Sequence, residues 1–191
     1  MTAALKGADG VTRCPWGNTT EDYAAYHDEE WGVELHGEAA LYERLSLEAF
    51  QSGLSWLTIL RKREAFRRAF AGFEPKLVAE FGAEDVERLM NDASIVRNRA
   101  KIDATIRNAQ AIADLDVPLD DLLWSFAPTG RRKRPKLLSD VPAVTDESKA
   151  MAKALKKRGF AFVGPTTAYA LMQATGMVDD HLAGCWRASR G

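Results

Sequence analysis

The stretch EAALYERLSLEAFQSGLSWLTILRKREAFRRAF, residues 38–70, contains two helical patterns in succession. In its first half, Leu41, Leu45 and Ala49 are spaced four residues apart, so they share one face of a helix. The second half carries a similar apolar series with basic residues between its members: Leu57, Leu60, Phe66 and Phe70. A break at Ser52-Gly53 separates the two patterns. The stretch therefore predicts two amphipathic helices joined by a tight turn.

Helical patterns continue on the C-terminal side of this pair, over five further segments. They are residues 82–92, 98–115, 119–126, 146–158 and 165–176. Thr145 has the residue type of an N-cap, Gly159 ends the helix that follows it, and Pro165 occupies a first helical turn. Alternating apolar and polar runs, which would indicate strands, are almost absent. The sequence thus predicts an all-α fold with at least seven helices.

Length and composition bound the organisation of the chain. The 191 residues are 46% hydrophobic and 28% charged, which suits a single globular domain over residues 13–191. Residues 1–12 lack a periodic pattern and predict a flexible N-terminal tail, whereas three prolines and a glycine predict a long loop over 127–148. There is no run of about 18 apolar residues and no signal-peptide core. We therefore expect a cytoplasmic protein that does not enter a membrane and is a monomer by default.

The distribution of charge is more informative than the net charge of −1. Basic residues gather in four clusters, at 61–68, 97–101, 131–136 and 153–159. Such clusters are typical of a face that binds the phosphates of a nucleic acid. The alternative, which is the more common one for any single cluster, is a solvated helix face.

Cysteine and histidine residues gather near both ends of the chain. Cys14 and His27 lie near one end, and His181 and Cys185 are four residues apart near the other. A reducing cytosol argues against a disulfide between the two cysteines. Two thiolates and two imidazoles match a closed, structural zinc site, and on a helical turn His181 and Cys185 would share one face. The alternative is buried thiols beside surface histidines, and His36 is expected to be solvated in either case.

Aromatic residues are dense between residues 16 and 56, where Glu48 also interrupts an apolar helix face. Glu48 and Trp56 flank the Gly53 turn, and Tyr26 adjoins the candidate metal ligand His27. Large rings beside a carboxylate suit a pocket for a planar cationic ligand, because the rings stack on it and the negative charge pairs with it. The alternative is that the rings form core and Glu48 lies on the surface.

Six segments, taken in order, resemble the bacterial 3-methyladenine DNA glycosylase I family: RCPW (13–16), YHDEEWGV (26–33), LSLEAFQSGLSWLTILRKRE (45–64), DVERLMNDASIVRNRAKI (85–102), LLWSF (122–126) and KALKKRGFAFVGPTTAYALMQATGMVDDHLAGC (153–185). The resemblance covers about residues 13–187 and is thinnest over the basic loop 127–143. It implies an all-α helix-hairpin-helix glycosylase fold of two helical lobes, with a zinc ion joining the N- and C-terminal segments. It also implies an enzyme of base excision repair that hydrolyses the N-glycosidic bond of 3-methyladenine in alkylated double-stranded DNA.

The resemblance further implies roles for individual residues. It assigns the structural zinc to four ligands: Cys14, His27, His181 and Cys185. It places the extruded base between Tyr26 and Trp56, with Glu48 hydrogen-bonding the base edge. Two more rings are implied to line the same pocket, Trp16 and Tyr23. Gly53 and Leu54 are implied to approach the gap that the extruded nucleotide leaves in the duplex.

The segment FAFVGPTTAYA, residues 160–170, resembles the superfamily's hairpin, whose backbone N–H groups hold a DNA phosphate. This implies DNA contacts at Gly164 and Thr166. Bifunctional members carry a nucleophilic lysine directly after the hairpin glycine, whereas Pro165 follows Gly164 here. We therefore expect a monofunctional glycosylase without strand cleavage. Phe162 stands where the usual first glycine of the hairpin would be.

Asp179 lies two residues before a histidine, where many superfamily members carry an essential aspartate. The resemblance makes it a candidate catalytic residue beside Glu48, one that stabilises positive charge on the sugar or orients water. The alternative is a helix cap next to the metal site.

Two rival functions use many of the same residues. A non-catalytic, zinc-stapled protein that binds DNA damage would keep the basic faces and the metal ligands, but it would not need Glu48 beside Trp56. A zinc hydrolase is disfavoured because four protein ligands leave no open position on the metal, and no spare histidine or aspartate cluster is present.

Overall fold

The computed structural model describes residues 2–130 and 133–189 of the chain. Within these ranges the structure is mainly helical: α1 (Glu21–Glu29), α2 (Glu38–Gln51), α3 (Trp56–Ala69), α4 (Pro75–Ala79), α5 (Ala83–Asn91), α6 (Arg99–Ala113), α7 (Leu119–Trp124), α8 (Asp146–Lys157) and α9 (Pro165–Ala174). Short 3₁₀ turns lie at Pro15–Asn18, Ala71–Phe73, Leu138–Asp140 and Trp186–Ser189. The fold class expected from the sequence is confirmed.

Helix boundaries follow the local signals in the sequence closely. The first predicted helix, 38–51, is α2 as the structure has it. Thr145 caps α8, because its side chain accepts a hydrogen bond from the Ser148 backbone N–H, and Pro165 opens α9. The two helices that the sequence analysis missed are α1 and α4. A signal for α1 was available, since Thr20 caps it and acidic residues occupy its first turn.

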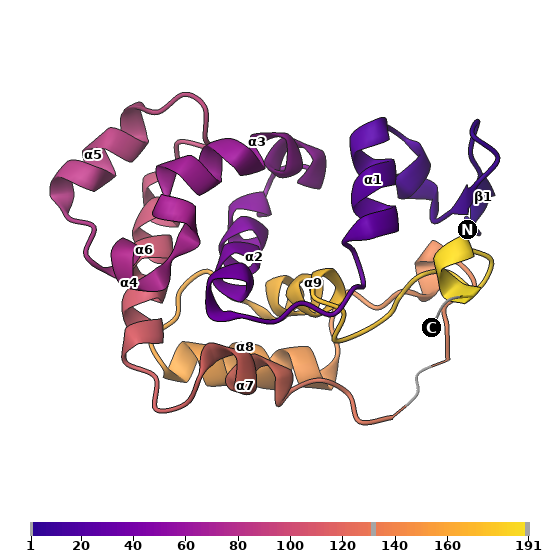
Figure 1. Cartoon of the computed structure of the whole chain (residues 1–191). Coiled ribbons are helices and arrows are strands. Elements are labelled where there is room, and N and C mark those ends of the chain that lie inside the picture. The colour runs from indigo at the N-terminus through magenta and orange to yellow at the C-terminus, as the bar shows by residue number, and fades with distance from the viewer. Residues whose placement is uncertain (1, 131–132, 190–191) are drawn as a thin grey trace.

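Helices α2 to α9 form one body around a shared apolar core (Figure 1). Helix α2 runs through its middle and packs against α3, α6 and α9, while α8 packs along α9. Leu41, Leu45 and Ala49 of α2 are buried, which the apolar spacing of this helix predicts, and Phe50 is buried as well. The body therefore fixes the position of α2, the helix that carries Glu48.

The turn between α2 and α3 has a specific support from another helix. Gly53 adopts a φ of 80°, a left-handed conformation that glycine tolerates best. Lys101 of α6 is buried, and its ammonium group donates to the backbone oxygens of Phe50 and Ser52, at 2.8 and 2.5 Å. This member of the basic cluster at 97–101 thus stabilises the end of α2 from inside the protein.

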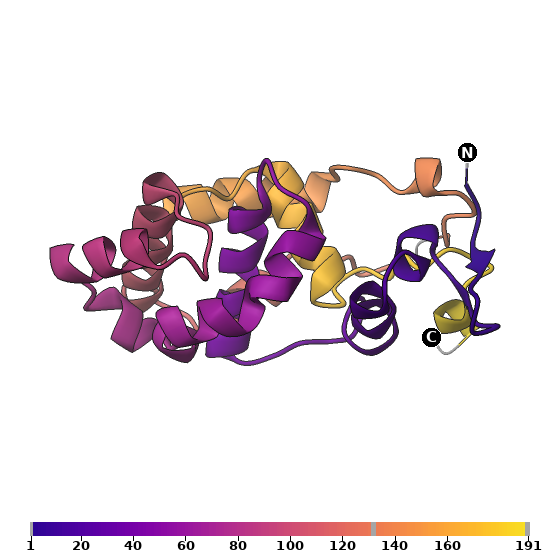
Figure 2. The ribbon, with the colours of Figure 1, turned by 90° about the horizontal axis from the view of Figure 1, so that it is seen from above.

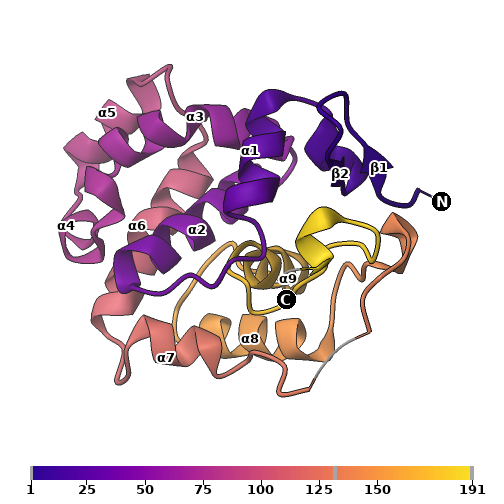
Figure 3. The ribbon, with the colours of Figure 1, turned by 45° about the vertical axis from the view of Figure 1, so that its right-hand side comes forward.

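Both ends of the chain lie together at one side of the helical body (Figures 1 and 2). Residues 1–12 were expected to form a flexible tail, but Leu5–Lys6 (β1) pairs antiparallel with Thr12–Arg13 (β2). This hairpin lies beside α1 and the C-terminal segment, as Figure 3 shows. Each strand has only two residues, a length at which the sequence shows no alternation to detect. In the described part of the chain, no helix is both long and apolar enough to cross a membrane.

Candidate functional site

A cavity of about 390 Å³ opens where α1, α2, α3 and the C-terminal segment meet. This volume falls within the range of small-molecule pockets. Its wall contains all five residues that the sequence placed in a base pocket: Trp16, Tyr23, Tyr26, Glu48 and Trp56. The structure therefore brings together side chains that are up to 40 residues apart in the sequence, from Trp16 to Trp56.

The aromatic part of the wall is held in place by contacts between α1 and α3. The Leu57 backbone N–H donates to the Tyr23 hydroxyl oxygen at 2.9 Å, which ties the start of α3 to α1. The rings of Tyr26 and Trp56 lie 5.4 Å apart between centroids and are tilted by 45°. A flat base stacked between two rings needs about 7 Å, which is two van der Waals contacts. The base predicted to lie between them therefore requires these rings to separate, or it stacks on one of them.

Trp56 offers the pocket a hydrogen-bond donor as well as a ring. Its indole Nε1 is buried and has no hydrogen-bond partner among the described residues. A buried donor without a partner is costly, so such groups in a pocket wall are commonly satisfied by a ligand.

Glu48 is buried, with only 6% of its surface exposed, so the alternative of a surface carboxylate is wrong. It is one turn of α2 away from Arg44, which is also buried. Burial raises the pKa of Glu48 to about 7, and the positive charge of Arg44 acts in the opposite direction. A carboxylate in this state can pair with a cationic base or accept a hydrogen bond from the base edge.

A second carboxylate, Asp180, lies on the same cavity wall. It is 4% exposed, and it accepts hydrogen bonds from the Tyr169 hydroxyl and, at 2.9 Å, from the Gln173 amide. The motif in the sequence points to its neighbour Asp179 and not to Asp180. No local pattern in the sequence distinguishes which of two consecutive aspartates faces a cavity.

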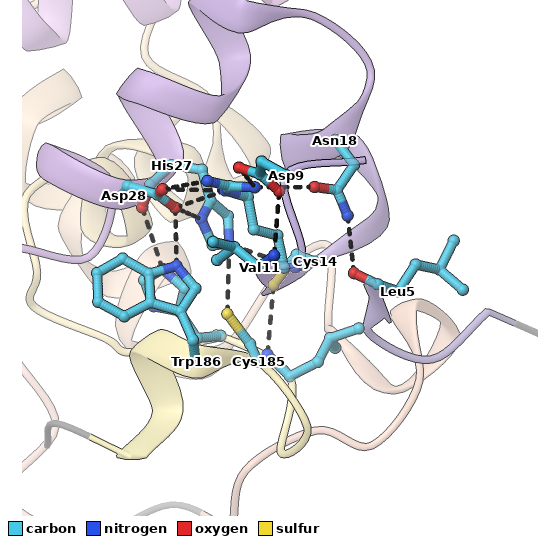
Figure 4. Close-up of polar contacts among 12 residues, drawn as sticks. Leu5, Asp9, Val11, Cys14, Asn18, His27, Asp28, Cys185 and Trp186 are labelled. Atoms are coloured by element: carbon cyan, nitrogen blue, oxygen red, sulfur yellow. Dashed lines mark hydrogen bonds and ion pairs between the residues drawn. The ribbon is translucent and has the colours of Figure 1, made fainter. Parts of the chain in front are cut away.

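The two ends of the chain meet in a buried cluster of metal-ligating side chains (Figure 4). The ligand atoms of Cys14, His27 and Cys185 all lie within 4.8 Å of one another. Tetrahedral zinc places its ligand atoms about 3.5 Å apart, so small side-chain shifts would bring these three to the metal. The pKa of Cys185 is lowered to about 4 by a hydrogen bond with Cys14 and, after the opposing effect of burial, by His27. This donor set fits a soft divalent cation.

The fourth expected ligand, His181, lies beside this cluster but not within it. Its ring is 4.8 Å from that of His27, and its Nε2 is 3.5 Å from the His27 carbonyl oxygen. Residues 181–185 form a turn and not the helical turn that the spacing suggested. The remaining histidine, His36, is exposed as expected and bonds to Asp120 at 2.8 Å.

His27 of the cluster and His181 beside it are both oriented by carboxylates through their Nδ1 atoms. Asp28 Oδ1 lies 2.8 Å from His27 Nδ1, and Asp179 Oδ1 lies 2.8 Å from His181 Nδ1. Asp28 also accepts hydrogen bonds from Arg13 and Trp186 (Figure 4). Carboxylates that hold the far ring nitrogen of a histidine are typical of metal sites, because they fix the tautomer that binds the metal.

The candidate catalytic residue Asp179 is therefore bound at the metal cluster and does not line the cavity. It pairs with Arg134 Nη2 at 2.7 Å and accepts a hydrogen bond from the His181 backbone N–H. Burial acts to raise its pKa, but the bonds from His181 and Arg134 outweigh burial and hold the pKa well below its ordinary value. These contacts are closer to the alternative interpretation, in which Asp179 caps backbone N–H groups beside the metal site. No helix begins here, however.

The residues expected to contact DNA lie on two exposed turns. Gly53 and Leu54 form the exposed turn between α2 and α3, beside the cavity residue Trp56. Gly164 and Thr166 are exposed at the start of α9, after the turn that follows α8. Phe162 in that turn is 45% exposed and adopts a φ of 57°, the left-handed conformation expected of the glycine it replaces.

Basic side chains accompany only some of these turns. A groove beside the α8–α9 turn is lined by four cations, Arg107, Lys149, Lys153 and Lys156. By contrast, Arg61, Arg63 and Arg67 of α3 are paired with Asp22, Glu30 and Glu43. The predicted basic cluster at 131–136 lies partly outside the described residues, at 131–132. Hence the cluster around 153–159 lies next to one of the expected DNA contacts, the start of α9.

Comparisons with known proteins show the family of this chain. The family model described as methyladenine glycosylase matches residues 16–188. The DNA-3-methyladenine glycosylase 1 of Escherichia coli (strain K12) is 46% identical over 183 residues, which are 92% of this chain and 96% of the relative. A crystal structure of a 3-methyladenine DNA glycosylase I has a TM-score of 0.88 at 44% identity, covering 91% of this chain and 98% of its own. A variant of a 3-methyladenine DNA glycosylase I, solved in complex with 3-methyladenine, has a TM-score of 0.84 at 38% identity, covering 91% and 96%. This chain belongs to the methyladenine glycosylase family.

Proposed function

We propose that this chain is a monofunctional DNA glycosylase that releases 3-methyladenine from alkylated double-stranded DNA. The observation that carries the proposal is the buried carboxylate of Glu48 beside Tyr26 and Trp56 in one cavity. A family member with 38% identity to this chain has been solved with 3-methyladenine bound. The rival function, damage binding without catalysis, does not require a buried carboxylate next to aromatic rings.

The base must leave the duplex before it reaches this cavity. Damage that weakens base pairing lowers the free energy needed to extrude the nucleotide, which favours alkylated over normal bases. Leu54 is 41% exposed on the α2–α3 turn, so it is placed to occupy the gap in the duplex. The turn after α8 and the lysines beside it bind the DNA backbone through phosphates, which sets the position of the protein but reads no sequence.

Inside the cavity the aromatic rings and Glu48 recognise different features of the base. Either Trp56 stacks on the base, or Tyr26 does so and the buried Trp56 Nε1 donates to an acceptor on the base edge. Adenine methylated at N3 is cationic while attached to the sugar, so the negative charge of Glu48 favours it over neutral adenine. The same positive charge makes the base a good leaving group, which reduces the need for a general acid.

The sugar develops positive charge as the glycosidic bond breaks, and water is the acceptor. A nearby carboxylate stabilises such an oxocarbenium-like state. Asp180 lies on the cavity wall, whereas Asp179 is held by His181 and Arg134 at the metal cluster. We therefore assign the electrostatic role to Asp180 and an orienting role to Asp179. The absence of a lysine after Gly164 supports hydrolysis without Schiff-base strand cleavage.

We also propose that a structural zinc ion joins the two ends of the chain. Cys14, His27 and Cys185 would hold it, with His181 completing the set. Bound there, the ion supplies cross-linking of the terminal segments and not chemistry at the base, because four protein ligands leave no open position. The α8–α9 pair would act as the helix-hairpin-helix motif of the superfamily. A cytoplasmic location and a monomeric state stay predictions.

The test is incubation of the protein with methylated double-stranded DNA, followed by chromatography of the released bases. We expect free 3-methyladenine, and strand breaks only after alkali treatment. Tight binding without base release would establish the damage-binding function instead. Strand breaks before alkali treatment would show a bifunctional enzyme.

Two substitutions test the pocket in the same assay. Glu48→Gln keeps the shape of the side chain but removes its charge, and we expect at least about a 100-fold loss of excision. Trp56→Ala should weaken excision by about 10- to 100-fold, the size of one lost base stack. Glu87→Gln, on the exposed face of α5, is the matched control and should act as the unmodified protein does. Normal excision by both pocket variants would place the base elsewhere.

A further inference from the structure

Behind the pocket lies an ionic network of one buried arginine, Arg44, and two partly exposed residues, Glu30 and Arg63. Arg44 of α2 is only 6% exposed, and its Nη2 donates to Glu30 Oε2 at 3.1 Å. Arg63 of α3 donates to the same carboxylate with two hydrogen bonds, at 2.6 and 2.9 Å. Glu30 follows the last residue of α1. One carboxylate thus joins two arginines across three helices.

Arg44 also contacts the pocket from behind. Its guanidinium carbon lies 5.6 Å from the centre of the Tyr26 ring, and its Nη1 is 3.5 Å from the Tyr26 hydroxyl oxygen. Arg44 is not part of the cavity wall, whereas Tyr26 is. Burying an arginine costs free energy unless nearby negative charges compensate its positive charge. Glu30 compensates it only in part, because the same carboxylate also pairs with Arg63.

Glu48 lies one helical turn further along α2, and burial destabilises its negative charge. Among the described residues no side chain or backbone group is hydrogen-bonded to its carboxylate, and burial favours the neutral acid. Arg44 supplies the opposing positive charge. Residues four apart on a helix lie on one face, so this charge acts over a short distance through protein and not through water.

We propose that Arg44 is a positioning residue that keeps Glu48 negatively charged inside the apolar pocket, and that Glu30 limits this effect by partly neutralising Arg44. The inference rests on the proposed function for its biological meaning, because the negative form of Glu48 is the one that pairs with an alkylated base. Arg44 thereby sets the lower end of the pH range in which the pocket works.

Other titratable groups lie on the elements around Glu48. They are Tyr23, Tyr26 and Glu30 from α1 and its end, Arg63 from α3, Lys101 from α6, Asp120 and Asp121 from α7, Tyr169 from α9, and Asp180 from the segment after α9. Lys101 is engaged with the backbone at the end of α2, and Tyr169 with Asp180. Asp120 is bound to His36 and Gly37 at the opposite end of α2. Among the described residues Arg44 is the cation whose charge acts on Glu48, and Glu30 is the anion that is hydrogen-bonded to Arg44.

The network predicts shifts of opposite sign for its two members. Removing the charge of Arg44 leaves burial unopposed, so the pKa of Glu48 rises and the acid form persists to higher pH. Removing the charge of Glu30 frees both arginines, so the pKa of Glu48 falls. An opposite charge within about 4–6 Å of a carboxyl group shifts its pKa by about one to three units. A variant that merely loosens the pocket would not produce shifts in opposite directions.

The experiment is a pH titration of the Glu48 carboxyl carbon by NMR in the free protein with labelled glutamate, the signal being assigned by its loss in Glu48→Gln. We expect a midpoint of about 7 in the unmodified chain. Arg44→Met, which keeps the length and apolar stem, should raise the midpoint by about one unit or more, and Glu30→Gln should lower it. The acid limb of 3-methyladenine excision should move in the same directions.

Controls separate this electrostatic effect from damage to the fold. Arg67 of α3 forms a different ion pair with α2, to Glu43, and this pair lies outside the cavity. Arg67→Met removes that pair and should leave the Glu48 midpoint unchanged. Arg44→Lys keeps the positive charge, so its Glu48 midpoint should lie close to that of the unmodified chain. If Arg44→Met does not fold, Arg63→Met tests the same direction of shift, because Glu30, once freed from Arg63, neutralises Arg44 more fully.

A Glu48 midpoint that stays the same in these variants, or that moves in one direction for Arg44 and Glu30 alike, would overturn the proposal. Failure of the unmodified protein to excise 3-methyladenine would contradict the proposed function and leave the NMR result intact.

Discussion

At the scale of single residues, the pocket depends on which of several similar side chains is buried in it. Glu48 and Asp180 are buried on the cavity wall, whereas Asp179 is bound to His181 and Arg134. Carboxylates that differ little in the sequence therefore have different environments. On the basis of those environments we propose charge complementarity for Glu48, stabilisation of the sugar for Asp180, and orientation of a histidine for Asp179.

This assignment predicts different effects for the two neighbouring aspartates. Asp180→Asn should lower excision of 3-methyladenine by about 100-fold, the cost of one lost electrostatic contact to the transition state. Asp179→Asn should retain excision but release zinc about 10- to 100-fold more readily, as expected for a carboxylate that orients a metal ligand. Excision rates and competition for zinc with a coloured chelator measure the two effects. The reverse result, with excision lost only in Asp179→Asn, would restore Asp179 as the catalytic residue.

At the scale of elements, the turn between α8 and α9 is expected to contact DNA, and it contains a residue in an unfavourable backbone conformation. Phe162 adopts a φ of 57° and is 45% exposed. A left-handed conformation costs a residue with a side chain about 1 kcal/mol more than it costs glycine. The turn keeps this geometry because α8 and α9 pack along each other on both sides of it and fix its ends.

We predict that Phe162→Gly is more stable than Phe162→Ala by about 1 kcal/mol. Both variants lose the phenyl ring, but only alanine must still adopt the left-handed conformation. Lys153, exposed in the interior of α8, is the matched position, and there alanine should be the more stable of the two by about 1 kcal/mol. Urea denaturation of the four variants measures these differences. An alanine variant that is the more stable at both positions would contradict the conformation of this turn.

At the scale of the whole molecule, the two ends of the chain form one structural unit. The N-terminal hairpin, α1 and the C-terminal segment meet around Cys14, His27 and Cys185 (Figure 3). Tyr26 of the pocket is adjacent in sequence to His27 of this cluster. A metal ion at the cluster would therefore stabilise both the closure of the chain and the placement of α1 beside the pocket.

Removal of metal should lower the stability of the whole chain. We expect metal analysis to give one zinc ion per chain, and dialysis against a strong chelator to lower the melting temperature, because the binding free energy of a structural zinc ion contributes to folding. Cys185→Ser should have the same effect without a chelator. A metal-free preparation that melts at the same temperature as the untreated protein would exclude a stabilising zinc.

Local patterns in the sequence predicted most of the helices in the described residues, but not α1 or α4. Apolar spacing located α2 and α3, and Thr145 and Pro165 marked the starts of α8 and α9, because these signals depend on residues close together in the chain. The sequence also supplied the candidate thiols, imidazoles and rings. It did not reveal the N-terminal hairpin, whose two-residue strands are too short to carry a pattern.

Which of these side chains lie together depends on the packing of the helices. Glu30, Arg44 and Arg63 come from three different stretches of the chain and show no common pattern in the sequence. Their meeting beside Tyr26 and Glu48 depends on how α1, α2 and α3 pack. Burial and the field of neighbouring charges, which set the state of Glu48, arise from contacts between residues far apart in the chain. Such long-range contacts exist only once the helices have packed, and so no local signal in the sequence specifies them.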